Sequence, residues 1–177
     1  MSTRPKNKQE FRREMAEAFI HVLEEEGLNW KKNWRGVGGG APFNGVTEAC
    51  YNGINRFNLA LTAMTRGYED PRWVTMVQIM DNKDTYHPGQ KWHLKKGSKA
   101  SWVEYWYQFD LKEKRAVAWK DYKELLKNGR QESEFRLSAR YTPVFNASCV
   151  EGMPELAHET NPEVKADALI EKLSLHH

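Results

Sequence analysis

The chain has 177 residues, of which 40% are hydrophobic and 29% charged, enough apolar material for one domain of ordinary size. No apolar run approaches the roughly 18 residues that cross a bilayer, and the basic residues 1–13 lack a following apolar stretch, so we expect a cytoplasmic protein without a membrane partner. Cys50 and Cys149 lack metal-ligand spacing, and we expect both to be reduced.

The net charge of +3 hides an asymmetry between the two parts of the chain. Residues 151–177 carry six acidic and two basic side chains, which leaves 25 basic and 18 acidic side chains in residues 1–150, a net charge of +7. A basic folded part favours an anionic partner, although a soluble protein without such a partner can have the same charge.

The first half of the chain is predicted to be mainly helical. Residues 1–8 are polar, and we expect them to be a disordered basic N-terminus. Apolar side chains recur at helical spacing over residues 9–26, and Gly27 is suited to end that helix. Residues 36–42 are a glycine-rich loop that lacks the Lys-Ser/Thr of a phosphate-binding loop.

Two further helices are predicted before the chain changes its pattern. One covers residues 54–66 and ends at Gly67. The other is short, runs to about residue 82, and begins with Thr75 and Gln78 at the spacing of a capping box.

The second half is predicted to contain the strands. Residues 100–109 alternate with period two and place aromatic rings on both faces of one strand. One face must pack into the core, and we expect the other, with Trp102 and Trp106, to face solvent, another layer or a ligand. A short strand over 116–119 and a helix over 122–127 follow.

The last predicted strand covers residues 135–145, where Pro143 is expected to limit pairing at the strand end or to place the strand on an edge. Residues 153–177 are predicted to be an acidic linker and a C-terminal amphipathic helix. These elements predict an α+β fold in a single domain, with a small antiparallel sheet packed against several helices.

No catalytic motif is present. His158-Glu159 begins like the zinc-binding HExxH motif, but Pro162 stands where the second histidine would be. We therefore expect no catalytic residue, no metal and no cofactor in this chain.

The tryptophans follow a different pattern, because five of the seven lie directly beside a lysine or an arginine. A ring next to a cation suits an unpaired nucleobase and its phosphate. Three such sites stand out, and each has a purely structural alternative. The lysine-rich stretch over 91–99 can be a solvated loop, and residues 30–34 can anchor the core. Arg72 and Trp73 can form a cation–π pair with each other.

An ordered set of short motifs extends this observation. It comprises Trp30-x3-Trp34, Pro42-Phe-Asn44, Tyr51-Asn-Gly-Ile-Asn55, Gly67-Tyr68, Arg72-Trp73-x-Thr75-x2-Gln78, Lys96-Gly-Ser-Lys99 and Val144-Phe-Asn146. The set resembles the N-terminal single-stranded-DNA-binding domain of ArdC-type antirestriction proteins, which also occurs in plasmid primases. The resemblance implies such a domain over residues 9–152. In that family a metallopeptidase-like domain usually follows, and we expect it to be absent from this chain, which is then a stand-alone member or a fragment.

The resulting hypothesis is a protein that binds single-stranded DNA without strong sequence preference, in antirestriction or in plasmid or conjugative transfer. The rings expected to stack bases are Trp34, Trp73, Trp102 and Trp106. The cations expected to contact phosphates are Lys31, Lys32, Arg72, Lys91, Lys95, Lys96 and Lys99.

Two further expectations concern the turn before the second helix and an alternative function. Gly53 and Asn55 are expected mainly to shape the turn into the second helix, Gly53 through its backbone freedom and Asn55 through side-chain bonds to amides. The alternative function is a protein-interaction or substrate-recognition module that works with a metallopeptidase-like domain or a restriction enzyme.

Overall fold

The computed structural model describes residues 5, 7–27, 40–81 and 91–156. In these residues the α-helices are α1 (Lys8–Glu26), α3 (Gly53–Arg66), α4 (Met76–Asp81) and α5 (Trp119–Lys127). The strands are β1 (Phe43–Asn44), β2 (Arg72–Thr75), β3 (His93–Leu94), β4 (Ser101–Asp110), β5 (Arg115–Val117), β6 (Phe135–Asn146) and β7 (Val150–Glu151). The predicted C-terminal helix and most of the predicted N-terminal segment lie outside the described residues.

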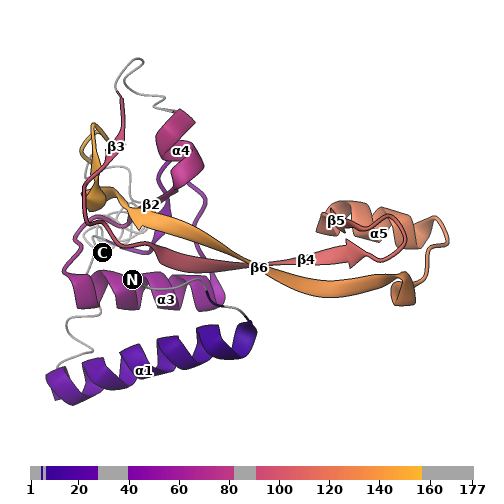
Figure 1. Cartoon of the computed structure of the whole chain (residues 1–177), viewed down its shortest axis with the longest axis horizontal. Coiled ribbons are helices and arrows are strands. Elements are labelled where there is room, and N and C mark those ends of the chain that lie inside the picture. Colours follow the sequence, from indigo (N-terminus) through magenta and orange to yellow (C-terminus); the bar gives the residue numbers. More distant parts are fainter. Residues whose placement is uncertain (1–4, 6, 28–39, 82–90, 157–177) are drawn as a thin grey trace, which may run out of the picture.

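The fold is an α+β domain, as the sequence predicts. Five strands form one sheet in the order β1-β2-β6-β4-β5, and β3 pairs with β7 in a small second sheet. Every strand pair is antiparallel except β1 with β2. Figure 1 shows a body that holds α1, α3 and α4, from which β4 and β6 project as a long ribbon that carries β5 and α5 at its far end.

Local sequence signals explain the helix ends. The Asn7 side chain accepts a hydrogen bond from the Glu10 amide at 2.9 Å, so α1 begins close to its predicted start. Gly67 ends α3 in the left-handed conformation at φ 66°. The predicted capping box is confirmed, because the Gln78 amide donates to Thr75 Oγ1 at 3.2 Å and the Thr75 amide donates to Gln78 Oε1 at 2.9 Å.

The core of the body has two parts, one on each side of the sheet. On the α3 side, Trp73, Val103 and Val144 pack against Leu59 and Ala63. On the α4 side lies a second cluster, formed by Val74, Ile79, Trp92, Phe145 and Val150. Both faces of β2 and of the end of β6 are therefore covered, and the neighbours Trp73 and Val74 are both 0% exposed.

The prediction for Pro143 is wrong in one respect, because β6 is the central strand of the five. Pro143 pairs with Trp102 of β4, whose carbonyl points away from β6 toward Asn58. In such a non-hydrogen-bonded pair the backbone N of Pro143 points to the β2 side, where pairing begins only at Val144. The missing N–H therefore costs no ladder hydrogen bond.

Over residues 102–106 the outer edge of β4 is closed by side chains, because β5 pairs with β4 only from Gln108 to Asp110. Asn58 donates to the carbonyl of Trp102 at 2.9 Å. Asn55 donates to the Glu104 carbonyl at 2.9 Å and accepts from the Glu104 amide at 2.7 Å. These bonds satisfy the backbone groups that an unpaired strand edge leaves open. Asn55 does bond to backbone groups, as predicted, but they belong to Glu104 of β4, 49 residues away in the chain, and not to the turn before α3.

Farther along the same edge, the indole Nε1 of Trp119 donates to the Trp106 carbonyl at 3.0 Å. This bond draws Trp119 out of β5, which ends at Val117, and into the first turn of α5. The observed strand β5 is therefore shorter than the predicted strand over 116–119. The observed helix α5 is longer than the predicted helix over 122–127.

Replacing Asn55 by alanine is expected to lower the free energy of unfolding by about 2 kcal/mol, because it leaves a buried N–H and C=O of Glu104 without partners. Urea unfolding followed by circular dichroism measures the change. Asn52→Ala is the control, since the Asn52 side chain is exposed and, among the described residues, hydrogen-bonds only to the Cys50 carbonyl at 3.4 Å. Equal losses for the two variants would contradict the role of Asn55.

Candidate nucleic-acid interface

The arm, defined as residues 105–140, has two faces set by the pairing of β4 with β6. The ten pairs run from Ser101 opposite Val144 to Asp110 opposite Phe135 without interruption. Residues opposite each other in such a pair point to the same face, and neighbours along a strand point to opposite faces. The covered face carries Trp102, Glu104, Trp106, Gln108 and Asp110 from β4. The open face carries Tyr105, Tyr107 and Phe109 from β4, with Arg140, Ser138 and Arg136 opposite them on β6.

Helix α1 closes the covered face near the body. The Arg12 Nη2 and Glu104 Oε2 atoms are 2.7 Å apart, and Glu104 is 3% exposed. Tyr141 donates to the other oxygen of Glu104 at 3.3 Å, and its ring lies 5.3 Å from that of Phe11. Burial, followed by the Glu104 carboxylate, raises the pKa of Tyr141, which keeps its hydroxyl protonated as a donor.

Helix α5 packs on the same face at the tip, where Leu137 of β6, opposite Gln108, stays 52% exposed. The rings of Tyr122 and Phe135 meet edge to face at 5.0 Å, and Val117 is buried beside them. The Asp110 carboxylate accepts from the amides of Lys112 and Glu113 at 2.9 and 3.0 Å. These contacts hold the tip together where a two-stranded ribbon alone would be marginal.

Arg130 connects this turn to the end of β6. It donates to Asp110 at 3.0 Å and to Glu134, and its guanidinium lies 4.9 Å from the Phe135 ring centroid. The Glu113 amide and then Arg130 hold the pKa of Asp110 below its ordinary value, so the carboxylate is charged throughout the neutral range.

No described helix covers the open face. Tyr105 is 41% exposed, Arg136 and Arg140 are exposed, and Tyr107 and Phe109 are partly exposed. The Arg136 guanidinium lies 5.7 Å from the Phe109 ring centroid. Among the described residues, no carboxylate forms an ion pair with Arg136 or Arg140. The face therefore offers three rings in a row with two unneutralised guanidinium groups beside them.

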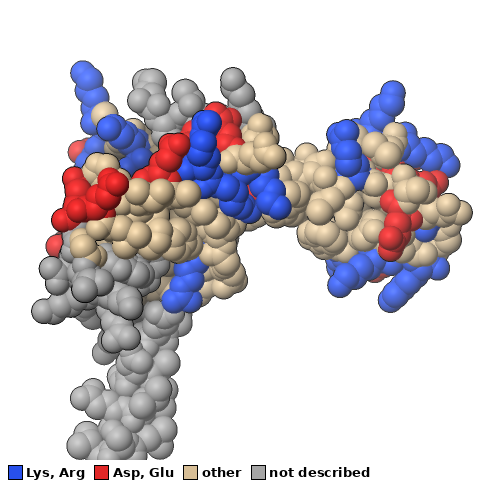
Figure 2. All heavy atoms as spheres, turned by 90° about the horizontal axis from the view of Figure 1, so that it is seen from below, with Lys and Arg blue, Asp and Glu red and all other residues tan. Residues whose placement is uncertain are grey.

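Figure 2 shows Lys and Arg side chains around the far lobe and along the narrow part that joins it to the body. The described basic residues of this lobe include Lys112, Lys114, Arg115, Lys120, Lys123 and Lys127. All six are exposed, so the lobe carries general positive charge on its surface besides the two arginines of the open face.

Several residues that the sequence predicts as contacts have other positions. Lys31, Lys32 and Trp34 lie outside the described residues. Trp73 is 0% exposed, so the prediction that it stacks a base is wrong: its ring fills the core between β2 and α3.

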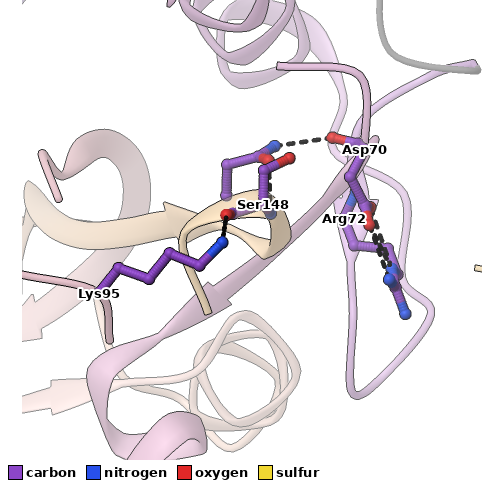
Figure 3. A network of polar contacts seen from close by, with 5 residues as sticks. Asp70, Arg72, Lys95 and Ser148 are labelled. Atoms are coloured by element: carbon purple, nitrogen blue, oxygen red, sulfur yellow. Dashed lines mark hydrogen bonds and ion pairs between the residues drawn. The ribbon is translucent and has the colours of Figure 1, made fainter. Parts of the chain in front are cut away.

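The prediction for Arg72 is also wrong. Its guanidinium is bound to Asp70, with Nη2 and Oδ2 2.7 Å apart, and the residue is 8% exposed (Figure 3). Asp70 in turn accepts from Asn146 at 2.7 Å through its backbone carbonyl. Arg72 therefore anchors the start of β2. It does not stack on Trp73, because neighbours along a strand point to opposite faces.

The lysine-rich stretch is exposed, but one of its members is engaged. Lys95 Nζ donates to the Ser148 carbonyl at 2.8 Å and ties this stretch to the end of β6 (Figure 3). Lys91, Lys96 and Lys99 are exposed and remain predicted phosphate contacts.

Trp102 and Trp106 are partly buried on the covered face, so of the three expected surroundings, solvent, another layer or a ligand, the structure shows another layer, helix α1. Trp102 lines a pocket of about 80 Å³ between α1 and α3, with Phe11 and Met15. Lys8 of α1 lies 5.5 Å from the Trp106 ring centroid. Both indoles are therefore contacted by residues of α1.

The sequence contained a partial signal for the open face. Arg136, Ser138 and Arg140 form the polar side of the last predicted strand, and a polar side is normally turned to solvent. Residues 111–134 separate the two strands, so the pairing register is not set by a short turn. A shift of one residue would have placed Trp106 opposite Arg140 or Ser138, on the same face as the arginines.

Similarity to known proteins identifies the family of this chain. The fold defines an α+β domain that carries a basic arm with exposed aromatic rings. Residues 9–145 match the family model of the N-terminal domain of anti-restriction factor ArdC, and the chain belongs to this family.

The relatives are longer than this chain. DNA primase TraC of Escherichia coli is 28% identical over 155 residues, which are 84% of this chain and 13% of TraC. The metal-free crystal structure of ArdC from plasmid R388 has a TM-score of 0.46 and 21% identity, over 84% of this chain and 49% of that one. Its Mn(II)-bound form has a TM-score of 0.44 and 22% identity, over 85% and 48%. The chain thus spans about half of these structures and a small part of TraC.

The described residues contain neither a group of metal-ligand side chains nor a membrane-spanning helix. No three His, Cys, Asp or Glu side chains within them are grouped so that they could hold a metal ion. None of the helices in the same residues is both long and apolar enough to span a bilayer.

The amide resonances of Lys112 and Glu113 are expected to titrate below pH 3.8, the ordinary pKa of an aspartate, because both amides donate to Asp110. Since the folded-state pKa is lowered, the stabilisation is complete above the unfolded-state pKa and is lost as the pH falls through the folded-state value. Two-dimensional NMR from pH 2 to 6 measures this. In Asp110→Asn the low-pH transition should disappear, and a midpoint above 3.8 in the parent would contradict the assignment.

Proposed function

We propose that the protein binds single-stranded DNA along the open face of the arm, with little direct reading of base identity. The observation that carries the proposal is the row Tyr105, Tyr107 and Phe109 opposite Arg140 and Arg136 on an uncovered sheet face. Aromatic rings stack bases of any sequence, and adjacent cations neutralise the phosphates. Lys91, Lys96 and Lys99 of the body extend the cationic path in this proposal.

The same geometry favours single strands over duplex DNA. In a duplex the base faces are already stacked on their neighbours, and their edges are paired. A ring that projects from a flat sheet face reaches a base only when that base has left its stack. Duplex DNA would keep the phosphate contacts alone, and its binding would therefore be weaker and more salt-dependent.

The biological setting follows from the relatives. The matched family is named for an anti-restriction factor, and the curated relative is a DNA primase. We propose a role in antirestriction or in plasmid transfer, in which the domain holds DNA while it is single-stranded. The proposed protein partners are a metallopeptidase-like domain or a restriction enzyme.

One observation favours the alternative function, a protein-interaction module. Helix α4 exposes Met76, Val77 and Met80, the last with 76% of its surface accessible. The two surfaces lie on different elements, so changes on the arm would leave such an interaction intact.

Replacing both Arg136 and Arg140 by alanine is expected to reduce the steepness of log K against log salt by about 1.4, because each lost phosphate contact on a single strand removes about 0.7. Fluorescence anisotropy with a labelled mixed-sequence oligonucleotide measures the slope. Lys123→Ala with Lys127→Ala is the matched control, since it removes the same charge from exposed positions of α5. Equal slope changes in the two double variants would show attraction by general charge and contradict an arginine-specific site.

Replacing Tyr107 by alanine is expected to weaken binding about tenfold with an unchanged salt slope, since stacking on one ring contributes about 1–3 kcal/mol. The same anisotropy titration tests this. Tyr107→Phe keeps the ring and should bind like the parent. Unchanged affinity of Tyr107→Ala, with lost binding in Lys96→Ala/Lys99→Ala, would move the site to the body.

A further inference from the structure

The spacing of the rings on the open face restricts the kind of strand that fits. Tyr105, Tyr107 and Phe109 occupy every second position of β4, and no bulge interrupts the register with β6 between them. Successive rings on one face of a strand are therefore about 6.8 Å apart, because each residue advances the strand by about 3.4 Å. Bases stacked in a helix are spaced at about half that distance, 3.4 Å per nucleotide.

This mismatch has a direct consequence for a bound strand. If each ring takes one base, neighbouring bases lie too far apart to stack on each other. The result is the same whether a ring lies flat under its base or stands between two bases. Each base exchanges a neighbouring base for a protein ring, and the strand is bound in a stretched form.

The positions of Arg136 and Arg140 fit a DNA strand that runs along the arm. Arg140 lies opposite Tyr105 and Arg136 opposite Phe109, so a guanidinium flanks each end of the row of rings. The adjacent strand β6 is about 4.8 Å from β4, which places the cations along one side of the rings. A sugar–phosphate chain parallel to the strands meets both guanidinium groups, whereas a chain that crosses the ribbon meets one at most.

We propose that the open face selects single strands by the ease with which their bases unstack, one base per ring, so that its preferred ligand is a weakly self-stacking, pyrimidine-rich strand. This inference rests on the proposed function and makes it more specific. Adenine runs stack strongly in free single strands and must give up that stacking to fit. Thymine runs stack weakly and give up little. Selection then comes from the shape and flexibility of the strand, without hydrogen bonds to base edges.

The test compares oligo(dT) and oligo(dA) of equal length on the whole chain. Anisotropy titrations should give a dissociation constant for oligo(dA) that is higher by a factor on the order of ten. Tyr107→Ala, which removes the middle ring, should weaken oligo(dT) more than oligo(dA) and narrow this ratio, and Tyr107→Phe should keep it. Circular dichroism of oligo(dA) at saturating protein should show loss of its base-stacking signal.

The outcomes separate this inference from the function on which it rests. Equal or tighter binding of oligo(dA), or a stacking signal that persists at saturation, overturns the stretched-strand inference while single-strand binding itself stands. Failure to bind either oligonucleotide overturns the proposed function. A ratio that Tyr107→Ala leaves unchanged would place the discrimination elsewhere and would also overturn the inference.

Discussion

The long antiparallel ladder between β4 and β6 is the interaction on which the rest of the structure depends. It starts inside the five-stranded sheet and continues beyond it as a ribbon of two strands. A ribbon of this kind is unstable in water unless something packs on it. Helix α1 and the α5–β5 tip pack on one face, and side chains of Asn55, Asn58 and Trp119 satisfy the backbone of the outer edge. The other face is thereby left to solvent, which is what a binding platform requires.

The choice of the covered face follows from charge as well as from ring size. Glu104 is a carboxylate within a ring-rich strand, and it is buried because Arg12 of α1 and the hydroxyl of Tyr141 both contact it. A buried carboxylate without such partners would be costly. Once α1 is positioned over Glu104, Trp102 and Trp106 fall under it as well. The rings of the opposite face have less cover: Tyr105 is 41% exposed, and among the described residues Arg136 lies over the Phe109 ring.

Local sequence signals located the helices and strands well because they act over a few residues. Asn7, Gly67 and the Thr75–Gln78 capping box have the same role in any fold, and Gly53 adopts its positive φ of 54° as the first residue of α3. The family resemblance, which was based on an ordered set of short motifs, is confirmed by the match over residues 9–145. Several motif residues turn out to hold the fold together: Asn55 bonds to the distant strand β4, and Arg72 and Asn146 both bind Asp70, just before β2.

The sequence by itself determined the α+β class, the helix ends, the basic charge and the presence of a strand with rings on both faces. Only the tertiary structure decided which of those faces is open. The reason is that alternation assigns residues to two sides of a strand but does not say which side is covered, and the register across residues 111–134 depends on contacts far apart in the chain. Burial of Trp73 and pairing of Arg72 with Asp70 were likewise outside the reach of local pattern, because a ring beside a cation has the same sequence in a core as on a surface.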